Sequence, residues 1–373
     1  MVFFVFFFGD FDYSLLANNI ILIINNINII LLISFLIMKI LNHIIKRNHI
    51  TEYKIIHKKP IEPSLFFQQR VNCKNTINVS KLKDNPKLKI RKIHDPFPIQ
   101  KNKNSKITFN LIDDSPLFAG TKSRAVVQTF LYYIREHRKK YNLSPNEPIH
   151  IHGVFAQKGY GQIAMAYGIF KLKKEHIIGH IHTIAFHDDI IPFLQKTCSI
   201  GAKLTDNKNN KNKYGHTYYH AYDFPSIWNV FDLIKYKTTN SPSNIFVGMG
   251  FDIDEFIHIL AHQIETALPE KLRKIKDTPL TFWVATSSGT ILRALYKVFP
   301  HAFFNGVQTG IKVDEDILDK SRTKIWIHPM KFSKNTDEIP PYDSLLNYDA
   351  KVWYFVRRYG KSGDYIWNVA GNL

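Results

Sequence analysis

Short apolar runs alternate with longer amphipathic stretches from residue 107 to residue 307. The apolar runs are typical of buried strands, and they cover residues 107–112, 149–156, 180–186, 201–204, 281–285 and 302–307. The stretches with apolar positions at helical spacing cover residues 123–140, 163–172, 188–198, 251–268 and 290–299. Strands that alternate with helices of about 10 to 15 residues predict an α/β fold with mostly parallel sheets.

The pattern before residue 107 is different. Residues 1–37 are strongly hydrophobic, but five asparagines interrupt the Ile- and Leu-rich part between Leu15 and Leu41. This part is long enough to span a bilayer, whereas asparagine is costly in a helix that faces lipid. Three interpretations stay open: a membrane anchor, translated sequence upstream of a true start at Met38, or a buried helix. The sequence in residues 43–106 is irregular, and we expect residues 38–106 to form a poorly ordered, basic extension.

Charge is concentrated in this extension. The chain carries a net charge of +19, and residues 38–106 hold seventeen Lys and Arg against four Asp and Glu. Such a segment can contact nucleic acid or an anionic membrane, but no recognisable nucleic-acid motif accompanies it, which favours a solvated tail. The two cysteines are too few for a disulfide framework and, without a Cys/His cluster, do not predict structural zinc. They fit a cytoplasmic protein, with membrane association only if residues 15–42 form an anchor.

Lys122 is the first candidate for chemistry. It follows Gly120 in a turn and precedes the helix predicted from residue 123. The positive end of a helix and the nearby Arg124 would both disfavour the ammonium form, as a Schiff-base lysine requires. The alternative is an ordinary solvated lysine at a helix start.

A second candidate is the loop between the strand at residues 281–285 and the following helix. It contains Thr286, Ser287, Ser288, Gly289 and Thr290, whose small side chains let backbone N–H groups approach a phosphate. The alternative is a simple helix cap. No GxxxxGK[ST] or GxGxxG motif supports an ATP or NAD site. A reactive amine and a phosphate loop together predict pyridoxal 5'-phosphate as cofactor.

A third candidate loop follows the strand at residues 149–156. It contains Gln157, Gly159, Tyr160, Gly161 and Gln162, which we predict to bind substrate, with the Tyr160 ring available for stacking. The alternative is a tight turn that needs glycine.

Two other groups of polar residues are more simply explained by structure. Histidines 150 and 152, and again 180 and 182, alternate along predicted strands. Same-face pairs can bind metal, but no neighbouring carboxylate completes a set, so we predict ordinary strand residues. Asp113 and Asp114 are interpreted as turn residues.

The order of these motifs resembles the tryptophan-synthase-β-like superfamily, the fold type II pyridoxal-phosphate enzymes, and is most similar to the aminocyclopropane-carboxylate deaminase and cysteine desulfhydrase branch. The resemblance covers roughly residues 107–330 and implies two three-layer α/β/α subdomains within residues 107–373. It implies that Lys122 carries the cofactor as a Schiff base and that residues 287–290 hold its phosphate. The aromatic stretch at residues 354–369 also resembles proteins of large DNA viruses.

The chain departs from the family pattern in three places. Thr121 stands beside the lysine where the family has asparagine, and the stretch from Gln157 to Tyr160 replaces Ser-Asn-His. The partner of the pyridine nitrogen has no clear counterpart, and Ser362 is only a guess.

These observations predict a pyridoxal-phosphate-dependent lyase or deaminase that acts on a small amino acid or related amine. Lys122 would also remove the α-proton, and a homodimer is possible. One alternative is a phosphoribosyltransferase-like nucleotide-binding enzyme, which would need two acids just before the Ser-Gly-Thr loop, and the sequence has none there. The other is a catalytically inactive binding protein of the same fold, which would use residues 38–106 to contact nucleic acid or membrane.

Overall fold

The computed structural model describes residues 85–96, 107–156, 158–184, 191–200, 202–203, 216–222, 226–239, 241–310 and 312–373. All of them belong to one compact unit, Lys59–Leu373. The predicted hydrophobic segment and most of the basic extension lie outside the described residues. Among those that are described, no helix combines the length and the apolar character needed to cross a membrane.

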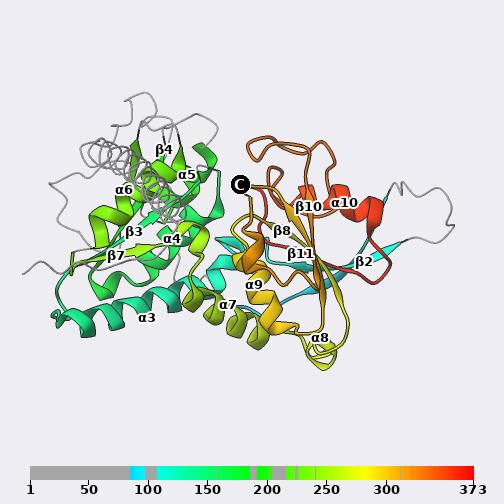
Figure 1. Cartoon of the computed structure of the whole chain (residues 1–373), viewed down its shortest axis with the longest axis horizontal. Coiled ribbons are helices and arrows are strands. Elements are labelled where there is room, and N and C mark those ends of the chain that lie inside the picture. Colours follow the sequence, from blue (N-terminus) through cyan, green and yellow to red (C-terminus); the bar gives the residue numbers. More distant parts are fainter. Residues whose placement is uncertain are drawn as a thin grey trace, which may run out of the picture. The chain divides into compact units, whose positions relative to one another are not determined.

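The first of two sheets has six strands in the order β1-β2-β11-β8-β9-β10 (Figure 1). Five of them are parallel, and only β1 runs antiparallel to its neighbour β2. The strands are β1 (Ile90–His94), β2 (Thr108–Asp113), β8 (Thr281–Thr286), β9 (Phe303–Gln308), β10 (Thr323–Ile327) and β11 (Tyr365–Asn368). Strand β1 corrects the expectation for the extension, because residues 90–94 are an ordered edge strand and Leu88 beside it is buried.

Helices cover both faces of this sheet. The side chains of β8 point alternately to one face and to the other, and so contact the helices on both. Phe282 and Val284 belong to the same buried cluster as the apolar face of α9 (Thr290–Val298). Trp283 and Ala285 belong instead to the cluster formed with α10 (Lys351–Tyr359).

The second sheet has five parallel strands in the order β5-β6-β4-β3-β7. They are β3 (Ile149–Val154), β4 (Ile177–Ile184), β5 (Ala202–Lys203), β6 (Thr217–Tyr222) and β7 (Asn244–Val247). One face packs against α4 (Tyr160–Lys171), where a side chain at Gly179 would meet Ile169. The other packs against α6 (Ile227–Thr239), where Phe231 contacts Phe246 with ring centroids 5.0 Å apart. Both sheets are therefore three-layered, and the predicted α/β class with mostly parallel strands is confirmed.

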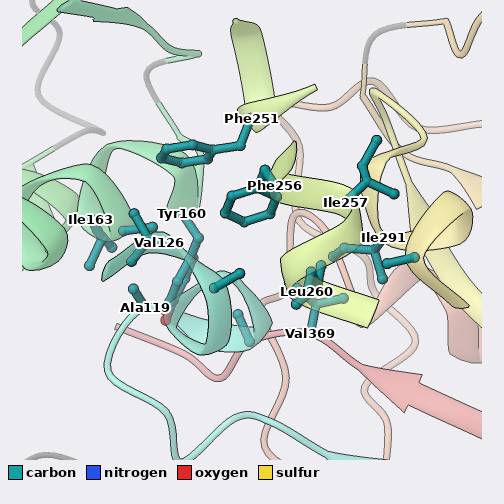
Figure 2. Packing of buried hydrophobic residues seen from close by; sticks show 14 of the residues in the cluster. Ala119, Val126, Tyr160, Ile163, Phe251, Phe256, Ile257, Leu260, Ile291 and Val369 are labelled. Carbon is teal, nitrogen blue, oxygen red and sulfur yellow. The ribbon is translucent and has the colours of Figure 1, made fainter. Parts of the chain in front are cut away.

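The remaining helices are α3 (Ser123–Tyr141), α5 (Ile191–Cys198), α7 (Asp254–Ala267) and α8 (Glu270–Ile275). Helix α7 packs against both α3 and α9, so one buried cluster includes side chains from both sheets. Figure 2 shows this cluster, in which the rings of Phe251 and Phe256 stack 5.0 Å apart.

Five histidines form two hydrogen-bonded rows on the α6 face of the second sheet. The first row joins His150 Nδ1 to His180 Nε2 at 2.9 Å and His180 Nδ1 to His220 Nε2 at 3.0 Å. The second joins His152 Nδ1 to His182 Nε2 at 3.1 Å, and His182 then contacts the Tyr222 hydroxyl at 3.1 Å. The described residues contain no group of three or more His, Cys, Asp or Glu arranged to hold a metal ion. The predicted placement of His150, His152, His180 and His182 on strands is confirmed. The position of His220 on β6 and the lateral hydrogen bonds were not predicted.

Candidate active site

Lys122 lies at the end of a single 3₁₀ turn, Gly120–Lys122, which leads directly into α3. The turn requires glycine at its first position, because Gly120 has a φ of 62° and a side chain there would collide with the carbonyl of Val369. The Thr121 N–H donates to that same carbonyl at 2.9 Å. The segment after β11 therefore fixes the backbone that presents the lysine.

A buried ion pair lies behind this turn. The Asp114 carboxylate accepts from Arg124 Nη2 at 2.6 Å and from the Thr121 hydroxyl at 2.8 Å, and both charged side chains are almost completely buried. Trp367 Nε1 in turn donates to the Thr121 oxygen at 3.1 Å. Thr121, which stands where the resembling family has asparagine, is thus a structural residue. Asp113 acts as the predicted turn residue, since its Oδ1 accepts from Ser115 N at 3.0 Å.

Burial lowers the pKa of Lys122 from 10.5 to about 8, while the charges of Asp349 and Asp252 partly oppose that shift. Arg124 does not contribute as we expected from the sequence, because its guanidinium is neutralised by Asp114. With a pKa near 8, roughly a tenth of the amine is neutral at pH 7. Lys122 therefore has the neutral fraction that a nucleophilic amine needs.

The side chain of Lys122 opens into a cavity of about 100 Å³. Residues from all three candidate segments line this cavity, although they are far apart in the sequence. Those that were predicted as site residues are Lys122, Gly159, Tyr160, Gly161, Ser287 and Ser288.

The serine loop forms the wall at the start of α9. Gly289 is the N-cap residue of α9 and has a φ of 81°. It has no side chain that could accept a hydrogen bond from the first backbone N–H groups of the helix. A side chain at Gly250 would meet Ser288 Oγ at 2.8 Å, and one at Gly310 would meet Ser287 Oγ at 2.6 Å. Glycine at these two positions thus lets the backbone pack against the two serine side chains, which lie at a helix N-terminus, where an anion is favoured.

The other residues predicted for this loop lie beside the cavity but do not line it. The Thr290 hydroxyl contacts Ser288 Oγ at 2.8 Å and so orients it. Thr286 is buried at the end of β8, and its hydroxyl has no hydrogen-bond partner among the described residues. Gly289 acts through its backbone conformation.

The opposite wall is the start of α4, which begins three residues earlier than the sequence pattern predicted. Gly161 is required there, because a side chain would meet the Phe155 ring at 2.6 Å. The Tyr160 ring lines the cavity, and its hydroxyl donates to Gly371 O at 2.7 Å and accepts from Lys196 Nζ at 3.2 Å.

Two residues of the predicted substrate loop are not part of this wall. Gln157 lies outside the described residues. Gln162 does not line the cavity, because its buried side chain turns toward Tyr219 and accepts from that hydroxyl at 3.0 Å. A helix that starts at Tyr160 brings Gln162 onto the face that packs against β6.

Asp349 is a cavity residue that the sequence did not reveal. It is the only acid among the described residues that line the cavity, and it is 1% exposed. Its Oδ1 accepts from Val369 N at 3.1 Å, whereas its Oδ2 has no hydrogen-bond partner among the described residues. Burial raises its pKa from 3.8 to about 8, although two backbone N–H groups and the charge of Lys122 oppose the shift.

Ser362, the residue guessed from the sequence as the partner of a ring nitrogen, lies elsewhere. It is exposed in the turn before β11, where its hydroxyl contacts Thr108 O at 3.4 Å. The cavity therefore combines a nucleophilic amine, a helix start suited to an anion and a buried acid.

Comparisons with known proteins give only distant similarity. No protein-family model matches the chain, and no curated protein sequence matches it. Among solved structures, diaminopropionate ammonia lyase from Escherichia coli in its apo form aligns with a TM-score of 0.43 and 12% identity over 78% of this chain and 94% of its own. Threonine deaminase isoform 2 from Solanum lycopersicum gives 0.44 and 11% over 84% and 86%, and O-ureido-L-serine synthase gives 0.47 and 10% over 79% and 91%. At this level of similarity the site is judged from its own residues.

Proposed function

We propose that the cavity binds pyridoxal 5'-phosphate and that the chain is a lyase or deaminase acting on a small amino acid. One observation carries this proposal: Lys122 and the serine loop before α9 line the same cavity, as attachment and phosphate binding by one cofactor require. The residues fit the group, because Ser287 and Ser288 line the cavity at the N-terminus of α9, where an anion is favoured, and the amine of Lys122 has a lowered pKa. Residues 107–373 would be the catalytic body.

Each wall of the cavity has a separate task in this proposal. When bound, the cofactor would supply an electron sink for a carbon of the substrate. Ser287, Ser288 and the first N–H groups of α9 would hold the phosphate. Lys122 Nζ would hold the cofactor covalently and, after an incoming amine has displaced it, would take the proton from the substrate's α-carbon. Gly159, Tyr160 and Gly161 would orient the carboxylate of the substrate at the start of α4.

The proposal is tested by the visible absorbance of the purified protein with added pyridoxal phosphate, before and after reduction with borohydride. We expect reduction to fix the cofactor on Lys122, as mass spectrometry of the peptides would show. Lys122→Ala should lose both the absorbance and the fixed label, whereas Lys158→Ala, which changes another lysine of the same cavity, should keep them. Equal labelling of both variants would contradict the proposal.

Turnover separates this proposal from an inactive binding protein of the same fold. The active enzyme should release ammonia or a carbonyl product from a panel of small amino acids, and Lys122→Ala should not. Cofactor labelling without turnover would favour the inactive binding protein. A phosphoribosyltransferase-like enzyme is less well supported, because residues 283–286 place no acid before the serine loop.

A further inference from the structure

The unpaired oxygen of Asp349 has no role in the function described so far. We propose that Asp349 Oδ2 faces the ring nitrogen of the bound cofactor and transfers its proton to that nitrogen. This inference rests on the proposed function, because it takes pyridoxal phosphate as the ligand. It makes Asp349 the residue that sets the charge of the ring.

The surroundings of Asp349 hold only one of its two oxygens. Val369 N donates to Oδ1, and the Ala370 N–H also acts on the carboxyl, but Oδ2 has no hydrogen-bond partner among the described residues although the side chain is almost completely buried. An unsatisfied buried polar atom costs about 1–3 kcal/mol, so it is expected where a ligand completes the hydrogen bond. Because Asp349 lines the cavity, a ligand there is the available partner.

The polar groups of the cofactor can be matched to the walls one by one. Lys122 accounts for the aldehyde, and Ser287 and Ser288 account for the phosphate. Of the ring oxygen and the ring nitrogen that remain, the nitrogen is the stronger base. A carboxyl that is easily protonated in the empty cavity suits a base, because proton transfer converts a neutral pair into a carboxylate beside a cation.

This step moves one proton between two groups in the cavity and exchanges none with solvent. The proton leaves Asp349 Oδ2 and joins the ring nitrogen, so the net charge of the complex does not change. The raised pKa of Asp349 means that the carboxyl carries this proton at neutral pH before the ligand binds. Asp349 interacts electrostatically with five ionisable groups. They are Asp113, Lys122, Tyr160, Tyr342 and Tyr348.

The first experiment is a comparison of two ligands in two proteins. Wild type and Asp349→Leu are titrated with pyridoxal phosphate and with an analogue in which CH replaces the ring nitrogen. We expect wild type to bind pyridoxal phosphate at least about tenfold more tightly than the analogue, because a charge-assisted hydrogen bond is lost. Asp349→Leu should bind both ligands equally. An equal loss of affinity for both ligands on substitution would overturn the inference, because it would place Asp349 away from the nitrogen.

The second experiment already gives a decisive result with wild type, so it stands even if Asp349→Leu does not fold. The cofactor labelled with ¹⁵N in the ring is bound to wild type, and its NMR shift reports whether the nitrogen carries a proton. We expect a protonated nitrogen in wild type and in the control Asp252→Asn, which changes an acid that acts on Lys122 without lining the cavity. In Asp349→Leu we expect the nitrogen to lose its proton.

The outcomes separate the two proposals. A cofactor that binds to Lys122 with an unprotonated ring nitrogen in wild type would overturn the role of Asp349 and leave the proposed function standing. Failure of wild type to bind the cofactor at all would remove both.

Discussion

Asp349 and Lys122 line the same cavity, where loss of solvent disfavours their charged forms at a cost to the folded protein. The pKa of Asp349 is raised to about 8, so the folded state holds its proton more tightly than the unfolded chain does. The pKa of Lys122 is lowered, so the folded state holds its proton less tightly. Both shifts mark groups whose surroundings favour the neutral forms that ligand chemistry uses.

Replacing Asp349 should stabilise the empty protein in a way that depends on pH. A carboxyl with a raised pKa contributes its full stability below pH 3.8, and this contribution is lost as the pH rises through 8. Asp349→Asn keeps an oxygen for Val369 N and cannot ionise. We therefore expect it to be more stable than wild type by up to about 5 kcal/mol near pH 8, with little difference near pH 4.

Urea unfolding at both pH values measures this difference. Asp316→Asn, which changes an acid that is 89% exposed, is the matched control and should shift neither value appreciably. A gain that is the same at pH 4 and pH 8 would show that charge is not its cause.

At the scale of elements, the turn that carries Lys122 depends on one glycine. Gly120→Ala adds both an unfavourable positive φ and a collision with the Val369 carbonyl. Gly363→Ala is the matched control, because Gly363 has a φ of 96° but nothing within 4 Å of an added side chain. The control should lose about 1 kcal/mol of unfolding free energy, and Gly120→Ala should lose at least about 2 kcal/mol more.

Thermal or urea unfolding of the two variants gives the comparison. Gly120→Ala should also bind pyridoxal phosphate more weakly, because the carbonyl it displaces holds the Thr121 backbone beside Lys122. Equal losses of unfolding free energy in both variants would show that a side chain at residue 120 does not clash with the Val369 carbonyl.

The elements that were predicted correctly are those with a local signature. Gly120 before a helix and the small residues around Gly289 mark their turns in the sequence itself, so the positions of Lys122 and the serine loop were foreseeable. Strand β6 was not predicted, because its polar His220 and Tyr222 side chains are satisfied by histidines of the neighbouring strand β4. Helix α6 and strand β7 were not predicted either. Strand β1 is polar because it is an edge strand, and it was interpreted as part of the extension. Asp349 has no motif, since only the fold brings it to the cavity.

Across the whole molecule, the histidine rows predict acid sensitivity. Burial, followed by the charges of neighbouring histidines, lowers the pKa of His152 from 6.5 to about 3 and shifts His180 and His182 in the same direction. The unfolded chain therefore binds more protons, so this stability is present above pH 6.5 and is lost as the pH falls toward 3.

We expect the free energy of unfolding to fall by up to about 1.4 kcal/mol per pH unit for each buried histidine between pH 6.5 and 4. The slope should become shallower in His182→Gln, which removes one of these protonation sites. His301→Gln, a change at an exposed histidine, should leave the slope unchanged. Chemical unfolding at several pH values measures these slopes, and equal slopes in all three proteins would contradict the prediction.

The position of β11 in the six-stranded sheet also sets the order in which the molecule can fold. It follows all other described strands along the chain, yet it lies between β2 and β8 and pairs Asn110 with Tyr365. Until it is in place, two strand edges stay open and the Lys122 turn lacks the Val369 carbonyl. Contacts between such distant parts of a chain form slowly. During synthesis the nascent chain thus exposes an interrupted sheet, and the ability to bind the proposed cofactor should be the last property regained on refolding.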